Sequence, residues 1–161
     1  MANTAGTAMT FQQIWSAMPD DKRRRAADAF WGDSELRSAQ ATAADEISRR
    51  LKIRAVTMKR LPVETKAKYL AAIHALSEPL AAALLRSYFF AQDRPLMAAF
   101  LDAAGVPHKD CVLEDNLSAP APDQLRQARQ QVRAQYPAED VELYFKVLLA
   151  QDPQMWAPLA E

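Results

Sequence analysis

The sequence predicts an all-α protein, and three observations support this prediction. Glycine occurs only three times in 161 residues, and the hairpin-forming dipeptides Asn-Gly and Asp-Gly are absent. Ala, Leu, Arg and Gln, which favour helices, are abundant throughout. Prolines and capping residues divide the chain at short intervals. We expect a single-domain multi-helix bundle of roughly ten short helices around a central apolar helix at about 78–92.

Candidate helix starts are residues whose side chains can accept hydrogen bonds from the first backbone N–H groups of a helix. In the first half of the chain these are Thr10, the Pro19-Asp20-Asp21 run, Ser34 and Thr42, while Gly32 and Pro62 mark helix ends. The predicted helices cover 10–18, 19–32, 35–40, 43–51, 54–61 and 64–76.

In the second half, Ser77 precedes the 78–92 helix, which is apolar nearly all round, as a helix in the middle of a core should be. Helices are also predicted over 94–104 and 123–136, from Pro137 onward, and from Asp152-Pro153 to the end; residues 106–122 form an irregular loop. Segments 84–102 and 143–160 share an apolar helix, Ala-Gln-Asp, a proline and a methionine. This similarity fits a shared helix corner, with duplication as the alternative.

The chain has the size and composition of one globular domain. Residues 1–9 carry no basic cluster followed by an apolar run and are expected to be a flexible tail rather than a secretory signal. No stretch approaches the roughly 18 uncharged apolar residues that a membrane span needs. The single cysteine, Cys111, cannot form an internal disulfide. We expect a cytoplasmic protein in a domain covering 10–161.

The charges are divided between the two halves of the sequence. Residues 1–75 hold 13 Lys and Arg against 8 Asp and Glu, whereas residues 76–161 hold 7 against 12. The basic part, 10–75, could dock on the acidic part, 76–161, or it could present a cationic surface to a polyanion.

Common catalytic and cofactor motifs are missing. Three scattered glycines cannot form a phosphate-binding loop, and one Cys with two His do not complete a structural zinc site unless carboxylates supply the remaining ligands. Neither a Glu-x-x-His pair nor a Gly-x-Ser-x-Gly turn occurs. We expect no cofactor and favour a non-enzymatic function.

One local group of titratable residues lies in the irregular loop. His108 and Cys111 could form a Cys-His couple, or a metal ion could bind to them together with nearby carboxylates. The four weak metal candidates are His108, Cys111, Glu114 and Asp115.

Residues 44–61, ADEISRRLKIRAVTMKRL, combine an apolar spacing with dense positive charge. Buried positions are predicted at Ile47, Leu51, Ile53, Met58 and Leu61, with Ser48 small enough for two helices to approach. This pattern resembles the helix-turn-helix of DNA-binding proteins. The resemblance implies a recognition helix over 54–60 and a left-handed backbone at Lys52, where the motif usually has glycine. The residues available to nucleic acid would be Arg49, Arg50, Lys52, Arg54, Thr57, Lys59 and Arg60.

Three functions remain open from the sequence. The favoured one is a non-catalytic helical scaffold that binds a protein partner or itself, using a partly covered last helix with Met155, Trp156 and Leu159. The alternative is nucleic-acid binding through 44–61. The third is a helical bundle that binds a small molecule. No membrane partner is expected.

Overall fold

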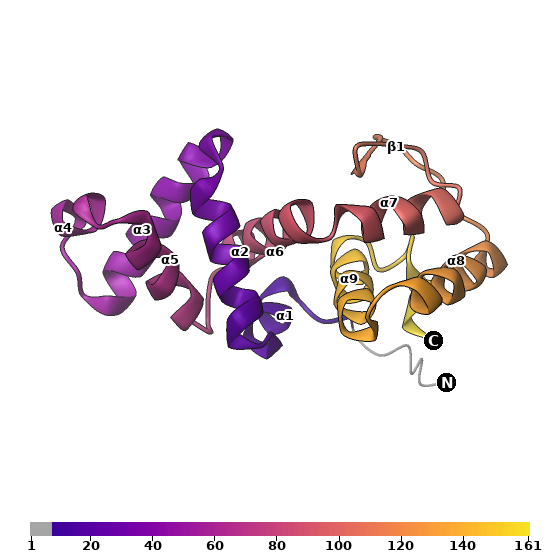
Figure 1. The fold of residues 1–161 in the computed structure, drawn as a ribbon, viewed down its shortest axis with the longest axis horizontal. Coiled ribbons are helices and arrows are strands. Elements are labelled where there is room, and N and C mark those ends of the chain that lie inside the picture. The colour runs from indigo at the N-terminus through magenta and orange to yellow at the C-terminus, as the bar shows by residue number, and fades with distance from the viewer. Residues whose placement is uncertain (1–7) are drawn as a thin grey trace. The chain divides into compact units, whose positions relative to one another are not determined.

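The computed structural model describes residues 8–161, and the regular secondary structure in this part of the chain is helical apart from one short hairpin (Figure 1). The predicted all-α class is confirmed, with nine α-helices in the described residues. Contacts gather into two compact units: the N-terminal unit, Phe11–Ala91, and the C-terminal unit, Gln92–Glu161 together with residues 8–10. The single domain stays a prediction, and residues 1–7 of the expected tail lie outside the described residues.

The N-terminal unit contains six helices and one short 3-10 turn, and the last helix ends one residue beyond it. They are α1 (Phe11–Ala17), α2 (Asp20–Gly32), the 3-10 helix η1 (Ser34–Leu36), α3 (Arg37–Leu51), α4 (Ala55–Arg60), α5 (Val63–Ala72) and α6 (Glu78–Gln92).

The core of the N-terminal unit forms where α2 packs against α5. α2 contributes Ala26, Ala27 and Phe30, and α5 contributes Ala67 and Leu70, all without exposed surface. Three of these five side chains are alanines, which allow the two helix backbones to approach closely.

A buried arginine also joins parts of this unit. Arg23 of α2 is 2% exposed, and its Nε donates to the Ala71 carbonyl of α5 at 3.0 Å. Its guanidinium also pairs with Asp20 and donates to the Met18 carbonyl before α2. A buried guanidinium needs several acceptors, and here helix ends supply most of them.

Two predicted helices, 35–40 and 43–51, are in fact the 3-10 turn η1 followed by the single helix α3. Thr42 is not a helix cap. Instead, the Thr42 hydroxyl donates to the Ser38 carbonyl one turn earlier, at 3.3 Å, so the residue continues the helix.

The first turn of α1 is capped from a distant part of the sequence. The Glu78 carboxylate, at the start of α6, accepts hydrogen bonds from the backbone N–H groups of Phe11 and Gln12 at 2.7 and 3.1 Å. A carboxylate at this position satisfies free N–H groups and interacts favourably with the helix dipole.

The C-terminal unit contains α7 (Arg94–Ala103), β1 (His108–Lys109), β2 (Val112–Leu113), α8 (Pro122–Gln135), α9 (Ala138–Gln151) and the 3-10 helix η2 (Ala157–Ala160). An aromatic cluster forms its core, with the Phe100 ring centroid 5.8, 5.1 and 6.0 Å from those of Tyr144, Phe145 and Trp156. All four side chains are buried.

The predicted irregular loop 106–122 contains an antiparallel hairpin, in which β1 pairs with β2. Its two turn residues, Asp110 and Cys111, have φ values of 49° and 68°. Two successive positive φ values are typical of the type I′ turn, which matches the twist of a hairpin. The hairpin was not predicted because neither turn residue is glycine.

The prediction of a helix from Asp152-Pro153 to the end of the sequence is wrong. The Asp152 carboxylate does accept from the backbone N–H groups of Gln154 and Met155, at 3.2 and 3.1 Å. However, the chain then forms turns and the short helix η2, which contains Pro158. Proline lacks the N–H that an α-helix would use there. In contrast, the matching Gln92-Asp93 corner leads into the full helix α7.

Candidate nucleic-acid interface

The backbone over residues 44–61 has the helix, turn and helix that the sequence predicts. α3 ends at Leu51, Lys52 is left-handed with φ 55° and ψ 39°, and α4 begins at Ala55. The Ser48 carbonyl accepts hydrogen bonds from the backbone N–H groups of Lys52 and Ile53, the second at 3.0 Å. Such bonds end a helix and turn the chain. The predicted pair of helices joined by a short turn is therefore confirmed.

The apolar positions of this segment are mostly covered. Ile47 and Met58 have no exposed surface, and Ile53 and Leu61 are half-buried. The prediction that Leu51 is buried is wrong, since its side chain is 41% exposed. Leu51 is the last residue of α3, where the chain leaves the helix axis. Ser48 is half-buried, and α3 contacts α4.

The polar side of the segment is a cluster of exposed cations. We call it the cationic surface, and it consists of Arg49, Arg50, Lys52, Arg54, Lys59 and Arg60, all exposed. Within residues 8–161 its carboxylate contacts are limited to one long ion pair, between Arg50 and Glu46 at 3.9 Å. Arg49 donates only to a backbone carbonyl, that of Asp45. The positive charge is therefore largely uncompensated.

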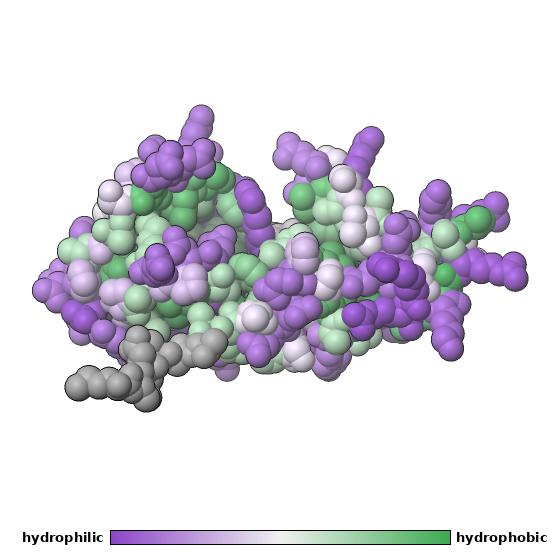
Figure 2. Space-filling view, turned by 180° about the vertical axis from the view of Figure 1, so that it is seen from behind, coloured by the Kyte–Doolittle hydropathy of each residue, from purple (hydrophilic) through white to green (hydrophobic). Residues whose placement is uncertain are grey.

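On α4, the geometry of the helix separates a buried side from an accessible one. Each residue turns the helix by about 100°. With Met58 facing inward, Val56 and Arg60 lie on the opposite side, and Thr57 and Lys59 flank them. All four are exposed. At the α4 end of the N-terminal unit, Figure 2 shows projecting hydrophilic side chains with some apolar surface among them.

The basic run continues to Lys68 in the sequence, but Lys66 does not share the cationic surface. Its ammonium lies 5.6 Å from the centroid of the Trp31 ring, a cation–π contact between α5 and α2. Lys68 is exposed.

The His108 group has different partners from those predicted. His108 Nε2 lies 2.8 Å from a carboxylate oxygen of Asp102, and its Nδ1 accepts from the Cys111 backbone N–H at 3.1 Å. The Cys111 thiol donates to the Arg94 carbonyl instead. With Nδ1 already an acceptor, the imidazole has no free nitrogen to take the thiol proton. The Cys-His couple, one of the alternatives that the sequence left open, is therefore not formed.

Metal binding at this hairpin is not supported either. Glu114 and Asp115 are exposed and follow β2. Among residues 8–161, no group of three or more His, Cys, Asp and Glu side chains is placed to hold a metal ion. His108 and Cys111 therefore serve the hairpin turn.

The prediction of a partly exposed interaction surface near the C-terminus is wrong. Met155, Trp156 and Leu159 are only 9%, 1% and 6% exposed. Trp156 belongs to the aromatic cluster around Phe100. These side chains form core in the C-terminal unit, because the turn after α9 folds them inward.

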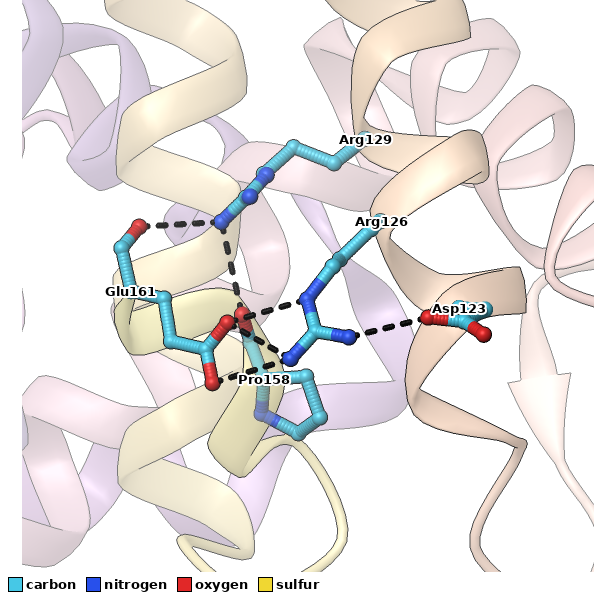
Figure 3. A network of polar contacts seen from close by, with 5 residues as sticks. All are labelled: Asp123, Arg126, Arg129, Pro158 and Glu161. Carbon is cyan, nitrogen blue, oxygen red and sulfur yellow. Dashed lines mark hydrogen bonds and ion pairs between the residues drawn. The ribbon is translucent and has the colours of Figure 1, made fainter.

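Charged residues of α8 hold the last residues of the sequence. Figure 3 shows Arg126 and Arg129 pointing from α8 toward Glu161 and Pro158. Arg126 makes a bidentate pair with the Glu161 carboxylate, at 2.9 and 3.1 Å, and Arg129 donates to the Pro158 carbonyl at 3.3 Å. More than 25 residues separate these partners in the sequence, so no local pattern predicted the network.

Comparison with protein-family models, with curated proteins and with solved structures finds no match to this chain. None of the helices within residues 8–161 is long and apolar enough to cross a membrane.

Proposed function

We propose that the protein binds duplex DNA through the α3–turn–α4 segment. The observation that supports this proposal is the cationic surface, in particular Lys52, Arg54, Lys59 and Arg60. In the described part of the chain, none of these four side chains has an acidic partner within ion-pair distance. Uncompensated cations on one surface are the usual electrostatic signature of a nucleic-acid interface.

The charge of the whole N-terminal unit acts in the same direction. Phe11–Ala91 holds fourteen Lys and Arg against nine Asp and Glu. Lys and Arg side chains that neutralise phosphates release condensed counterions, and this release supplies most of the non-specific affinity for DNA.

The segment suggests a division of roles along the DNA. In a helix-turn-helix, the first residues of the second helix approach base edges in the major groove. Here the corresponding residues are Arg54, directly before α4, and Val56 and Thr57 in its first turn. Arg49, Arg50, Lys52, Lys59 and Arg60 would contact phosphates. Since α4 has only six residues, few positions can contact bases, and phosphates should supply most of the affinity.

DNA is favoured over RNA because of groove shape. The major groove of B-form DNA admits a helix, whereas that of A-form RNA is deep and too narrow for side chains to contact bases. The side chains expected to serve a protein-scaffold function, Met155, Trp156 and Leu159, are buried. Binding to a protein partner therefore stays a prediction, and no surface of the protein is assigned to it.

The test measures fluorescence anisotropy of a labelled random-sequence duplex across a salt series. The double variant Arg49→Gln/Arg60→Gln should bind more weakly and reduce the slope of log affinity against log salt by about 2, or about 1 for each phosphate-binding arginine removed. The matched control is Arg25→Gln/Arg37→Gln, which removes two exposed arginines elsewhere in the same unit.

The control should keep most of the wild-type slope. Absence of binding at low salt would exclude the proposal. Equal weakening by the two double variants would show that net charge, rather than the α3–turn–α4 segment, determines binding.

A further inference from the structure

Val56 is an apolar side chain in an unusual position. It is 62% exposed, the highest value among the exposed large hydrophobic residues of the described chain. A single exposed valine is common on protein surfaces and needs no explanation by itself. Its surroundings are what distinguish it, because it lies on a six-residue helix within the cationic surface.

In the proposed binding mode, α4 places Val56 on the side that faces the DNA. It lies one residue inside the N-terminal end of α4 and on the side opposite the buried Met58. Arg60 follows it by four residues, so the two side chains lie next to each other on the same face. An apolar group flanked by cations fits a site where phosphates surround the edge of a base.

We propose that Val56 is a specificity-determining residue that contacts the C5 methyl group of thymine in the major groove. This inference rests on the proposed DNA-binding function. The thymine methyl is the one apolar group that base pairs present in the major groove, and apolar side chains recognise it. The methyl group of Thr57, also exposed, can enlarge the apolar contact.

The other bases fit this position less well. Cytosine presents an amino donor, and guanine presents two acceptors in the major groove. Valine cannot pair with any of these groups, so covering them would remove their water without a replacement hydrogen bond. Preference for A·T pairs follows from this difference.

The experiment removes the methyl groups from the DNA. Binding of the full chain is measured to an A/T-rich duplex and to the same duplex with deoxyuridine in place of thymine. The wild type should bind the thymine duplex about fourfold more tightly for each methyl contact, the factor expected for one buried methyl or methylene group. The Val56→Ala variant should lose most of this preference for the thymine duplex, while the salt dependence of its binding stays the same.

Val63→Ala is the matched control, because Val63 is 51% exposed and lies at the start of α5 instead of on α4. It should keep the wild-type ratio. In a second measurement, 5-methylcytosine in a G/C-rich duplex should restore part of the preference for the wild type alone, because its methyl occupies the same position in the groove.

The outcomes separate the two proposals. Salt-dependent binding with equal affinity for thymine and deoxyuridine duplexes would overturn the role of Val56 and leave DNA binding in place. A Val56→Ala variant that keeps the wild-type ratio would also overturn it. Absence of binding to either duplex would overturn the DNA-binding function, and the role of Val56 with it.

Discussion

The Cys111 thiol lies in the two-residue turn of the β1–β2 hairpin, and its surroundings favour the protonated form. Burial is the largest cause that raises the pKa of Cys111, and the nearby Asp110 and Asp102 charges raise it further. Arg94 acts in the opposite direction. Only the thiolate is a strong nucleophile, so this cysteine should react slowly at neutral pH.

This assignment predicts the pH dependence of alkylation. Because the pKa is raised, the thiolate forms at higher pH than in a free cysteine, and the midpoint of iodoacetamide alkylation should lie above that of N-acetylcysteine. Mass spectrometry of the native protein measures the rate. The Asp110→Asn variant keeps a residue suited to a left-handed turn and removes one negative charge, so its midpoint should fall below that of the wild type. A midpoint at or below that of N-acetylcysteine would contradict the assignment.

At the scale of one element, the turn between α3 and α4 contains strain that glycine would remove. A left-handed backbone at a residue with a Cβ costs about 1–2 kcal/mol, although glycine also loses more entropy on folding. We expect Lys52→Gly to be more stable than Lys52→Ala by about 0.5–1 kcal/mol, since both variants lack the charge but only one keeps the Cβ.

Urea unfolding followed by circular dichroism measures this difference. The alanine variant is the control for removal of the ammonium group. Equal stability of the two variants would mean that the φ of 55° at Lys52 carries no net cost.

The α3–turn–α4 segment also shows which features local sequence can predict. The end of α3 near Leu51 was predicted from patterns within 18 positions, and the left-handed Lys52 was implied by the resemblance to a helix-turn-helix, whereas the start of α3 at Arg37 was not predicted. The Glu78 cap on α1 and the Arg126–Glu161 pair join residues 67 and 35 positions apart, so no local periodicity indicates them. The Asp110-Cys111 turn was not predicted because its left-handed residues include no glycine.

For the molecule as a whole, the division of charge was predictable by counting, whereas the division into units was not. The C-terminal unit holds six Lys and Arg against eleven Asp and Glu, opposite in sign to the N-terminal unit. A count needs no structure. The units depend on which residues contact each other, and composition does not contain this information.

Because each unit has its own core, a cavity made in one core should destabilise that unit more than the other. Phe100→Ala removes the centre of the aromatic cluster and should destabilise the C-terminal unit by about 3–5 kcal/mol. Hydrogen-exchange mass spectrometry should then show faster exchange in residues 92–161 than in 11–91. The matched variant Phe30→Ala, equally buried in the N-terminal unit, should show the reverse. Equal acceleration throughout the chain in both variants would indicate that the protein unfolds as one cooperative body.

The Glu78 cap has a consequence for the order of folding during synthesis. On a ribosome, residues 11–17 emerge long before Glu78, which lies 67 positions after Phe11. A seven-residue helix is too short to persist alone in water. We therefore expect the N-terminal helix of the nascent chain to stay unformed until the start of α6 has been translated, so that the first helix in the sequence is among the last to become stable.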